Sequence, residues 1–237
     1  MVYEILHNAE AVCYIMLKGL IDLIVCVPSQ TISISGREPV MFKTASGVDI
    51  PYLERIKEEY AVSENRIMFN ISFEKIKPFI LDFVSNLSEP LFFIIQKPLK
   101  EKYKPNSFTK GPFKAELLYF DLPTKTQILE VLDLYGEIIL NDGMSQFGIQ
   151  SHDTGDEIFF AKYKIAFIFS KDVEKHSFLL NKYGIRKTSH LITAWDVVSP
   201  DSPGKRSKVI VDNKDIIDVA EELKEVSLKY KSQIVDD

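Results

Sequence analysis

A chain of 237 residues, 46% hydrophobic and 27% charged, has enough apolar side chains to bury one large core or two small ones. Its formal net charge of −5 lacks the basic balance that nucleic-acid binding usually requires, so we expect no nucleic-acid partner. Sixteen phenylalanines and ten tyrosines exclude a composition typical of disorder.

The cysteine content and the first residues indicate a cytoplasmic protein. Cys13 and Cys26 lie in apolar sequence, where we expect them to be reduced core residues, and two thiols cannot form a disulfide scaffold. Glutamates precede the apolar run at 11–27, so the pattern of a signal peptide is missing. Charged residues interrupt that run, so no membrane span is predicted.

The first half of the chain predicts an alternation of helices and strands. Tyr3–Leu17 has a helical pattern, and a helix capped by Asp49 is expected to place Tyr60 on its buried face. A third helix follows the apolar spacing from Ile76 to Leu87. The strands predicted here are Leu23–Val27, Gln30–Ser35, Val40–Lys43, Arg66–Ile71 and Leu91–Gln96.

A change of composition divides the chain. Residues 97–112 are rich in lysine and proline and have no apolar periodicity, which is typical of a linker. We therefore predict an N-terminal domain over 1–104 and a C-terminal domain over 113–237, with one continuous domain as the alternative.

The second half begins with a strand and a capped helix. Thr124 and Gln127 predict a capping box, and the apolar stripe of that helix is expected to end at Gly136. A later helix ends at Gly184, a last one begins near Asn213, and the tail from Lys229 is expected to fray. The strands predicted here are Ala115–Phe120, Glu137–Leu140, Ser145–Gln150, Glu157–Phe160, Lys164–Phe169, His190–Val198 and Lys208–Val211. Together these elements predict an α+β fold with mainly antiparallel sheets and packed helices.

An acidic turn opens the two most Phe-rich strands, and it is the strongest candidate site. His152, Asp153, Asp156 and Glu157 are clustered there, and functional residues often lie on loops held by rigid strands. We expect a charged recognition edge. The alternative is a metal-dependent hydrolase that uses the same turn, although the spacing matches no EF-hand or HExxH motif.

The segment His190–Val198 contains the single tryptophan. In a strand, Trp195 would share a face with Leu191 and Val197, which predicts a core residue, and Asp196 would be exposed on the opposite face. We therefore include Asp196 among the candidate partner-binding residues. The sequence has no GxSxG, GxGxxG or GxxxxGK[ST] motif, so no catalytic residue and no cofactor are predicted.

Three segments of the second half, SHDTGDEI, KYKIAFIFS and LITAWDVVSPDSPG, resemble parts of bacterial toxin-immunity proteins. The resemblance implies tight, non-catalytic binding to one cognate toxin. We therefore expect a cytoplasmic inhibitor of a protein partner, such as a basic toxin domain, because opposite net charge speeds association. A structural or regulatory subunit is a further alternative.

Overall fold

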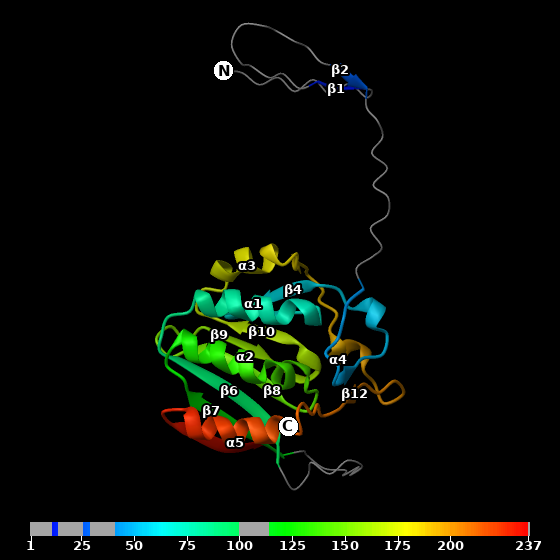
Figure 1. The fold of residues 1–237 in the computed structure, drawn as a ribbon. Helices are drawn as coiled ribbons and strands as arrows, with labels where there is room; N and C mark the ends of the chain where they lie inside the picture. Colours follow the sequence, from blue (N-terminus) through cyan, green and yellow to red (C-terminus); the bar gives the residue numbers. More distant parts are fainter. Residues whose placement is uncertain (1–10, 14–25, 29–40, 100–113, 237) are drawn as a thin grey trace, which may run out of the picture. The chain divides into compact units, whose positions relative to one another are not determined.

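The structure is a computed structural model that describes residues 11–13, 26–28, 41–99 and 114–236 (Figure 1). The chain divides into two compact units, Met1–Val40 and Met41–Asp237. Among the described residues, no helix is both long and apolar enough to cross a membrane.

The first unit contains a small antiparallel ladder. β1 (Ala11–Cys13) pairs with β2 (Cys26–Pro28), and the backbone of Cys13 lies opposite that of Cys26. The helix predicted over Tyr3–Leu17 is therefore wrong at Ala11–Cys13. The rest of that helix and the strand predicted at Gln30–Ser35 lie outside the described residues.

The second unit is built on one nine-stranded sheet. Every neighbouring pair is antiparallel except β11 and β4, which run parallel. The α+β class with mainly antiparallel strands is thus confirmed. The strand order is β11 (Arg186–Lys187), β4 (Glu59–Ser63), β5 (Arg66–Phe69), β10 (Ala166–Phe169), β9 (Glu157–Phe160), β8 (Gln146–Ser151), β6 (Leu91–Pro98), β7 (Lys114–Asp121) and β13 (Tyr230–Asp236).

This sheet crosses the predicted domain boundary. β6 lies in the predicted N-terminal domain 1–104, whereas both of its neighbours, β7 and β8, lie in the predicted C-terminal domain 113–237. The structure instead divides the chain after Val40, and the described residues on both sides of the lysine-rich segment share one sheet.

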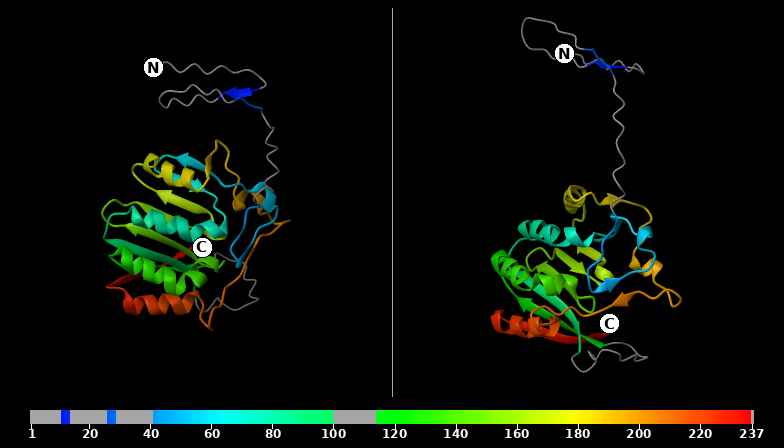
Figure 2. Two further views of the ribbon diagram at one scale, coloured as in Figure 1. Left: turned by 45° about the horizontal axis from the view of Figure 1, so that its top comes forward. Right: turned by 45° about the vertical axis from the view of Figure 1, so that its right-hand side comes forward.

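Three helices cover one face of the sheet (Figure 2). They are α1 (Phe73–Ser85), α2 (Lys125–Asn141) and α5 (Ile216–Val226). Alternate strand residues point toward them, including Phe160, Ile158 and Ile168, each with 0% exposure. Burying a side chain of this size stabilises the fold by about 1.5–3 kcal/mol. The helix-facing side of the Phe-rich strands is therefore core.

Helix α2 begins as predicted and ends later than predicted. Its capping box is present, because the Thr124 side chain accepts a hydrogen bond from the Gln127 N–H and the Gln127 side chain accepts one from the Thr124 N–H. Gly136 does not stop the helix, which continues to Asn141 and buries Ile139. The strand predicted at Glu137–Leu140 is wrong, because the 3.6-residue apolar period continues past the glycine.

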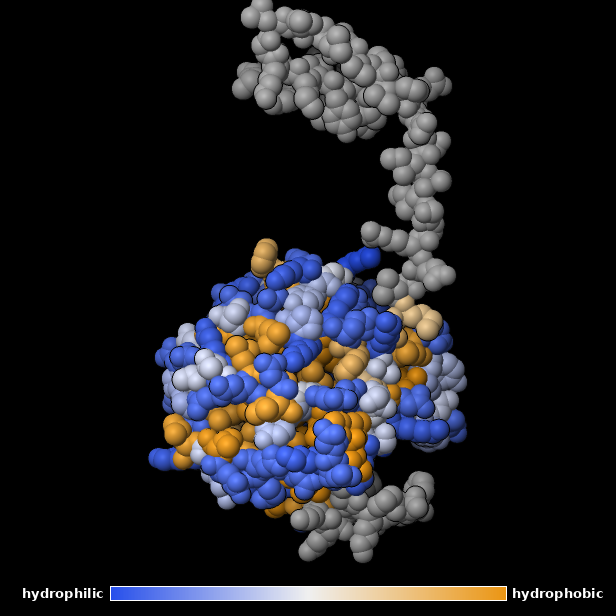
Figure 3. Space-filling view, viewed as in Figure 1, coloured by the Kyte–Doolittle hydropathy of each residue, from blue (hydrophilic) through white to orange (hydrophobic). Residues whose placement is uncertain are grey.

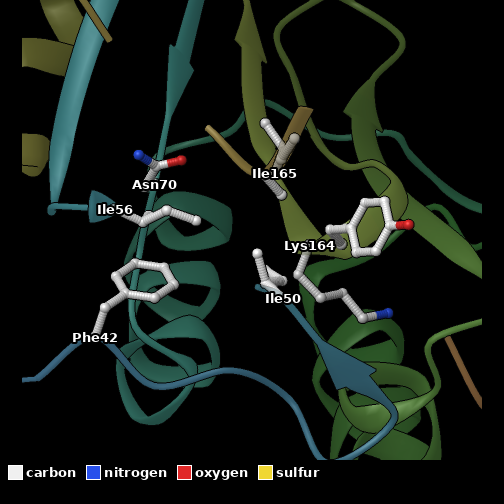
Figure 4. Close-up of a pocket in the computed structure, with 8 residues that line it drawn as sticks. Phe42, Ile50, Ile56, Asn70, Lys164 and Ile165 are labelled. Atoms are coloured by element: carbon white, nitrogen blue, oxygen red, sulfur yellow. The ribbon is translucent and has the colours of Figure 1, made fainter. Parts of the chain in front are cut away.

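A second apolar cluster covers part of the other face. Phe42, Ile50 and Ile56 gather beside Asn70, whose side-chain N–H groups donate to the carbonyls of Lys57 and Ile192 (Figure 4). The helix predicted after Asp49 is wrong, because the structure has a single 3-10 turn, η1 (Leu53–Arg55). Accordingly, Tyr60 lies in β4, and the strand predicted at Val40–Lys43 is irregular chain over Met41–Lys43.

Two glycines let three distant segments meet at the end of α2. The Gly47 N–H donates to the carbonyl of Asn141, the Gly143 N–H to that of Ser207, and the Ser207 N–H to that of Gly47. The same region contains the pairing of β3 (Val48–Asp49) with β12 (Lys205–Arg206). This contact, the glycine junction, fastens the second cluster to the helix layer.

A buried lysine lies beside the glycine junction. The Lys164 ammonium group donates to the carbonyls of Ile139 and Ser145, and in Figure 4 it points away from Phe42 and Asn70. Burial lowers the pKa of Lys164 to about 8, although the nearby charge of Asp142 acts in the opposite direction. Lys164 therefore satisfies carbonyls at the C-terminal end of α2, where a cation also suits the helix dipole.

The last third of the chain differs most from prediction. α3 (Ser177–Lys182) ends before Gly184, which has a φ of +75° as its predicted role requires. The strand predicted at His190–Val198 is a loop followed by α4 (Ala194–Val197), and the predicted strand Lys208–Val211 has one isolated bridge, from Val211 to Lys214. The tail from Lys229 does not fray, because β13 pairs with β7 over its whole length.

Candidate functional site

One row of side chains crosses the sheet on the face opposite α1, α2 and α5. The register places Phe92 of β6 beside Gln150 of β8, Gln150 beside Glu157 of β9, and Glu157 beside Phe169 of β10. Their strand neighbours point into the helix-covered core, so alternation directs these four residues to the other face. All four are partly exposed.

Aromatic contacts extend this row at both ends. His152 meets Phe92 edge-on, with ring centroids 5.3 Å apart. At the other end Phe169 stacks on Phe167, which is buried in the second apolar cluster and lies 5.9 Å from the exposed Trp195. We call the whole set the stripe: His152, Phe92, Gln150, Glu157, Phe169, Phe167 and Trp195.

Trp195 is a surface residue at the end of the stripe. It lies in α4 and is 49% exposed, so the predicted core position is wrong. The strand prediction failed because Thr193 and Asp196 form a capping box, which starts a helix where the apolar pattern suggested a strand. A half-exposed tryptophan on an aromatic surface is typical of a binding anchor.

Glu157 is the acidic residue at the centre of the stripe. Within the described residues its carboxylate has no hydrogen bond and no ion pair, and its flanking row neighbours are Gln150 and Phe169. Burial raises the pKa of Glu157 to about 7. Its charge also contributes, after burial, to a raised pKa of Tyr119, which places that phenol in the same electrostatic environment. A carboxylate desolvated in this way favours a cationic partner.

Asp156 belongs to the opposite face and to the protein interior. It is 5% exposed, and its carboxylate accepts hydrogen bonds from Thr154, Ser170 and Lys175. Burial alone would raise its pKa, but the hydrogen bonds, led by that from Lys175, hold the pKa below its ordinary value. Asp156 thus organises the turn, while its neighbour Glu157 faces outward.

The remaining predicted residues lie at the rim of the stripe. Asp153 is exposed in the turn beside His152. Asp196 is exposed next to Trp195, and its pKa is lowered chiefly by the hydrogen bond from the Thr193 backbone N–H. The structure therefore places His152, Asp153, Glu157 and Asp196 on or beside the stripe and directs Asp156 away from it.

A groove of about 370 Å³ lies on the other side of the turn, between α1 and α3. Phe83 and Leu179 contribute apolar lining, and the Lys175–Asp156 and Lys182–Asp82 ion pairs contribute charged lining. His176 stacks on Phe83. Its buried Nε2 atom has no hydrogen-bond partner in the described part of the chain and lies 3.9 Å from Asp156 Oδ1. Burial lowers the pKa of His176 and so favours the neutral imidazole.

The described residues contain no group of three His, Cys, Asp or Glu side chains arranged to hold a metal ion. The acidic turn does not form such a group, because Asp156 and Glu157 point to opposite faces. What the stripe offers chemically is aromatic surface, a desolvated carboxylate and exposed acidic neighbours. Comparison with known proteins adds no identification, because no protein-family model, curated protein or solved structure matches the chain.

Proposed function

We propose that this protein is a non-enzymatic, cytoplasmic protein-binding protein, an immunity-like inhibitor that uses the stripe to mask a basic toxin domain. The observation that carries the proposal is the exposed Trp195 at one end of a stripe of aromatic contacts, whose centre holds the Glu157 carboxylate, without a partner among the described residues. An apolar anchor, a desolvated charge and a polar rim are the parts of a protein interface.

Glu157 gives the proposal its preference for a basic partner. The folded protein already bears the cost of desolvating this carboxylate, so an ion pair with a lysine or arginine of the partner adds only the desolvation cost of that cation. Asp153 and Asp196 are exposed at the rim, and the net charge of −5 attracts a cationic protein from a distance.

Photocrosslinking in the native host tests the proposal directly. A photoreactive phenylalanine analogue at position 195 should capture one basic protein, and the same analogue at Leu134 should not. Leu134 is a suitable control because it is 74% exposed and lies on α2, on the opposite side of the sheet. The captured protein should stop growth when expressed alone, and co-expression of the wild-type chain should restore growth.

The affinity of the captured protein for purified variants then measures how much individual stripe residues contribute to binding. We expect Trp195→Ala to weaken binding by about tenfold or more, as is usual for an interface tryptophan, whereas Leu134→Ala should leave the affinity unchanged. Asp153→Lys should mainly slow association, and this effect should shrink at high salt. Equal losses from Trp195→Ala and Leu134→Ala, or a captured protein without toxicity, would contradict the proposal.

A further inference from the structure

β13 is an edge strand whose outer side is unpaired in the described part of the chain. It pairs with β7 from Tyr230 opposite Phe120 to Asp236 opposite Lys114, and no described strand lies beyond it. The Asp121 N–H donates to the carbonyl of Lys229. Backbone groups alternate in direction along a strand, so those of residues 231, 233 and 235 also face β7, and those of 230, 232, 234 and 236 face outward.

Apolar side chains gather at this edge. Val226 is 59% exposed, Leu228 68%, Tyr230 48% and Ile234 55%, and all four lie within nine consecutive residues. Figure 3 shows apolar surface beside α5 at the lower edge of the molecule, where this segment begins. Exposed apolar clusters beside a free strand edge are typical of surfaces that pair with another chain.

The edge also lacks two of the features that usually prevent such pairing. Tyr230–Asp236 contains no proline, and its register with β7 runs without a bulge. Lys231 is the one internal charged residue of this strand, and it points to the sheet face opposite the exposed Tyr230 and Ile234.

We propose that a second copy of this chain pairs with this edge, β13 against β13, in an antiparallel register centred on Ser232. The outward backbone groups of residues 230, 232 and 234 then meet those of residues 234, 232 and 230 of the second copy. Tyr230 lies opposite Ile234 of the second copy, and this apolar pair occurs twice by symmetry. The interface joins two sheets into one continuous sheet.

Charge along the segment favours the antiparallel direction. In this register Lys229 lies opposite Val235 and Lys231 opposite Gln233, so no two like charges lie directly opposite each other. A parallel arrangement would place like charges side by side. This self-complementarity selects a second copy as the occupant, and it is separate from the stripe, which lies on a face of the sheet and not at its edge.

Analytical ultracentrifugation of the full chain tests the proposal with two variants of one residue. Ser232→Pro removes an outward N–H, while Ser232→Ala keeps it, and both lose the hydrogen bond from Ser232 Oγ to Glu116. We expect wild type and Ser232→Ala to sediment at twice the mass of the 27.2 kDa chain, and Ser232→Pro at half the wild-type value. Circular dichroism should show the same folded signal for all three.

A side-chain variant covers the case in which Ser232→Pro fails to fold. Ile234→Lys should also halve the mass, and Leu134→Lys on the helix face should not. A dimer that survives Ile234→Lys would overturn the proposal, as would a monomeric wild type. If the wild type is monomeric and the amide of Ser232 resists hydrogen exchange, another segment of the same chain covers the edge; if that amide exchanges freely, no second copy covers it.

Discussion

Replacing Gly143 with alanine is expected to lower the free energy of unfolding by about 3 kcal/mol. A Cβ atom at this position would lie 1.9 Å from the backbone oxygen of Gly47 and 3.1 Å from the backbone nitrogen of Ser207. Backbone atoms cannot rotate away as a side chain can, so the glycine junction would have to separate. Urea denaturation monitored by tryptophan fluorescence measures the loss, since Trp195 lies in the part of the fold that the junction fastens.

Gly136→Ala is the matched control for this substitution. Gly136 lies inside α2, and an added Cβ would meet no atom within 4 Å. The same chemical change should therefore stabilise the protein by about 0.5–1 kcal/mol, because alanine has the higher helix propensity. Two alanine variants of equal stability would show that close backbone approach at Gly143 is not what holds the junction together.

Glu157→Gln is expected to stabilise the protein above neutral pH by about 2 kcal/mol and to have little effect near pH 4. The folded-state pKa of Glu157 is raised from 4.5 to about 7 by burial, so between these values the folded chain binds more protons than the unfolded chain. The wild type therefore loses stability as the pH rises from about 4.5 to about 7. Glutamine resembles the protonated side chain and avoids this loss.

Denaturant melts of both proteins across this pH range measure the difference directly. Asp153→Asn is the control, because it makes the same change from carboxylate to amide at an exposed position of the same turn. A stability gain from Glu157→Gln that is the same at pH 4 and pH 8 would show that the carboxylate is not desolvated. The expected pH-dependent gain, measured on the protein without a partner, would show that Glu157 lowers the stability of the free protein.

The elements that the sequence predicted correctly are those with local signals. The capping box at Thr124 is contained in four consecutive residues, and so is the alternation in Glu157–Phe160. The errors occur where contacts with a distant segment determine the secondary structure. β13 is a strand because β7 offers it an edge. Leu53–Tyr60 is not a helix because Leu53 and Ile56 belong to the second apolar cluster, whereas Tyr60 is buried in the helix-covered core.

The site shows the same division. The sequence could identify His152, Glu157 and Asp196, because polar residues next to apolar segments can be recognised without knowing the fold. It could not find Phe92 or Phe169, because their place beside Glu157 depends on the register of three strand pairs. It also grouped Asp156 with Glu157, although adjacent strand positions face opposite sides. Extending the strand alternation back to Asp156 would have placed Asp156 and Glu157 on opposite faces of the sheet.

The pairing of β7 with β13 means that the sheet cannot be completed until the C-terminal end of the chain has been synthesised. A ribosome completes β6 and β7 long before it reaches α5, which covers them, and β13, which borders them. Until residues 230–236 emerge, β7 is itself a bare edge on an unfinished sheet, and such contacts between distant segments form slowly. A premature stop before Tyr230 would therefore release a chain that aggregates, and the newly made protein should depend on chaperones that hold it during synthesis.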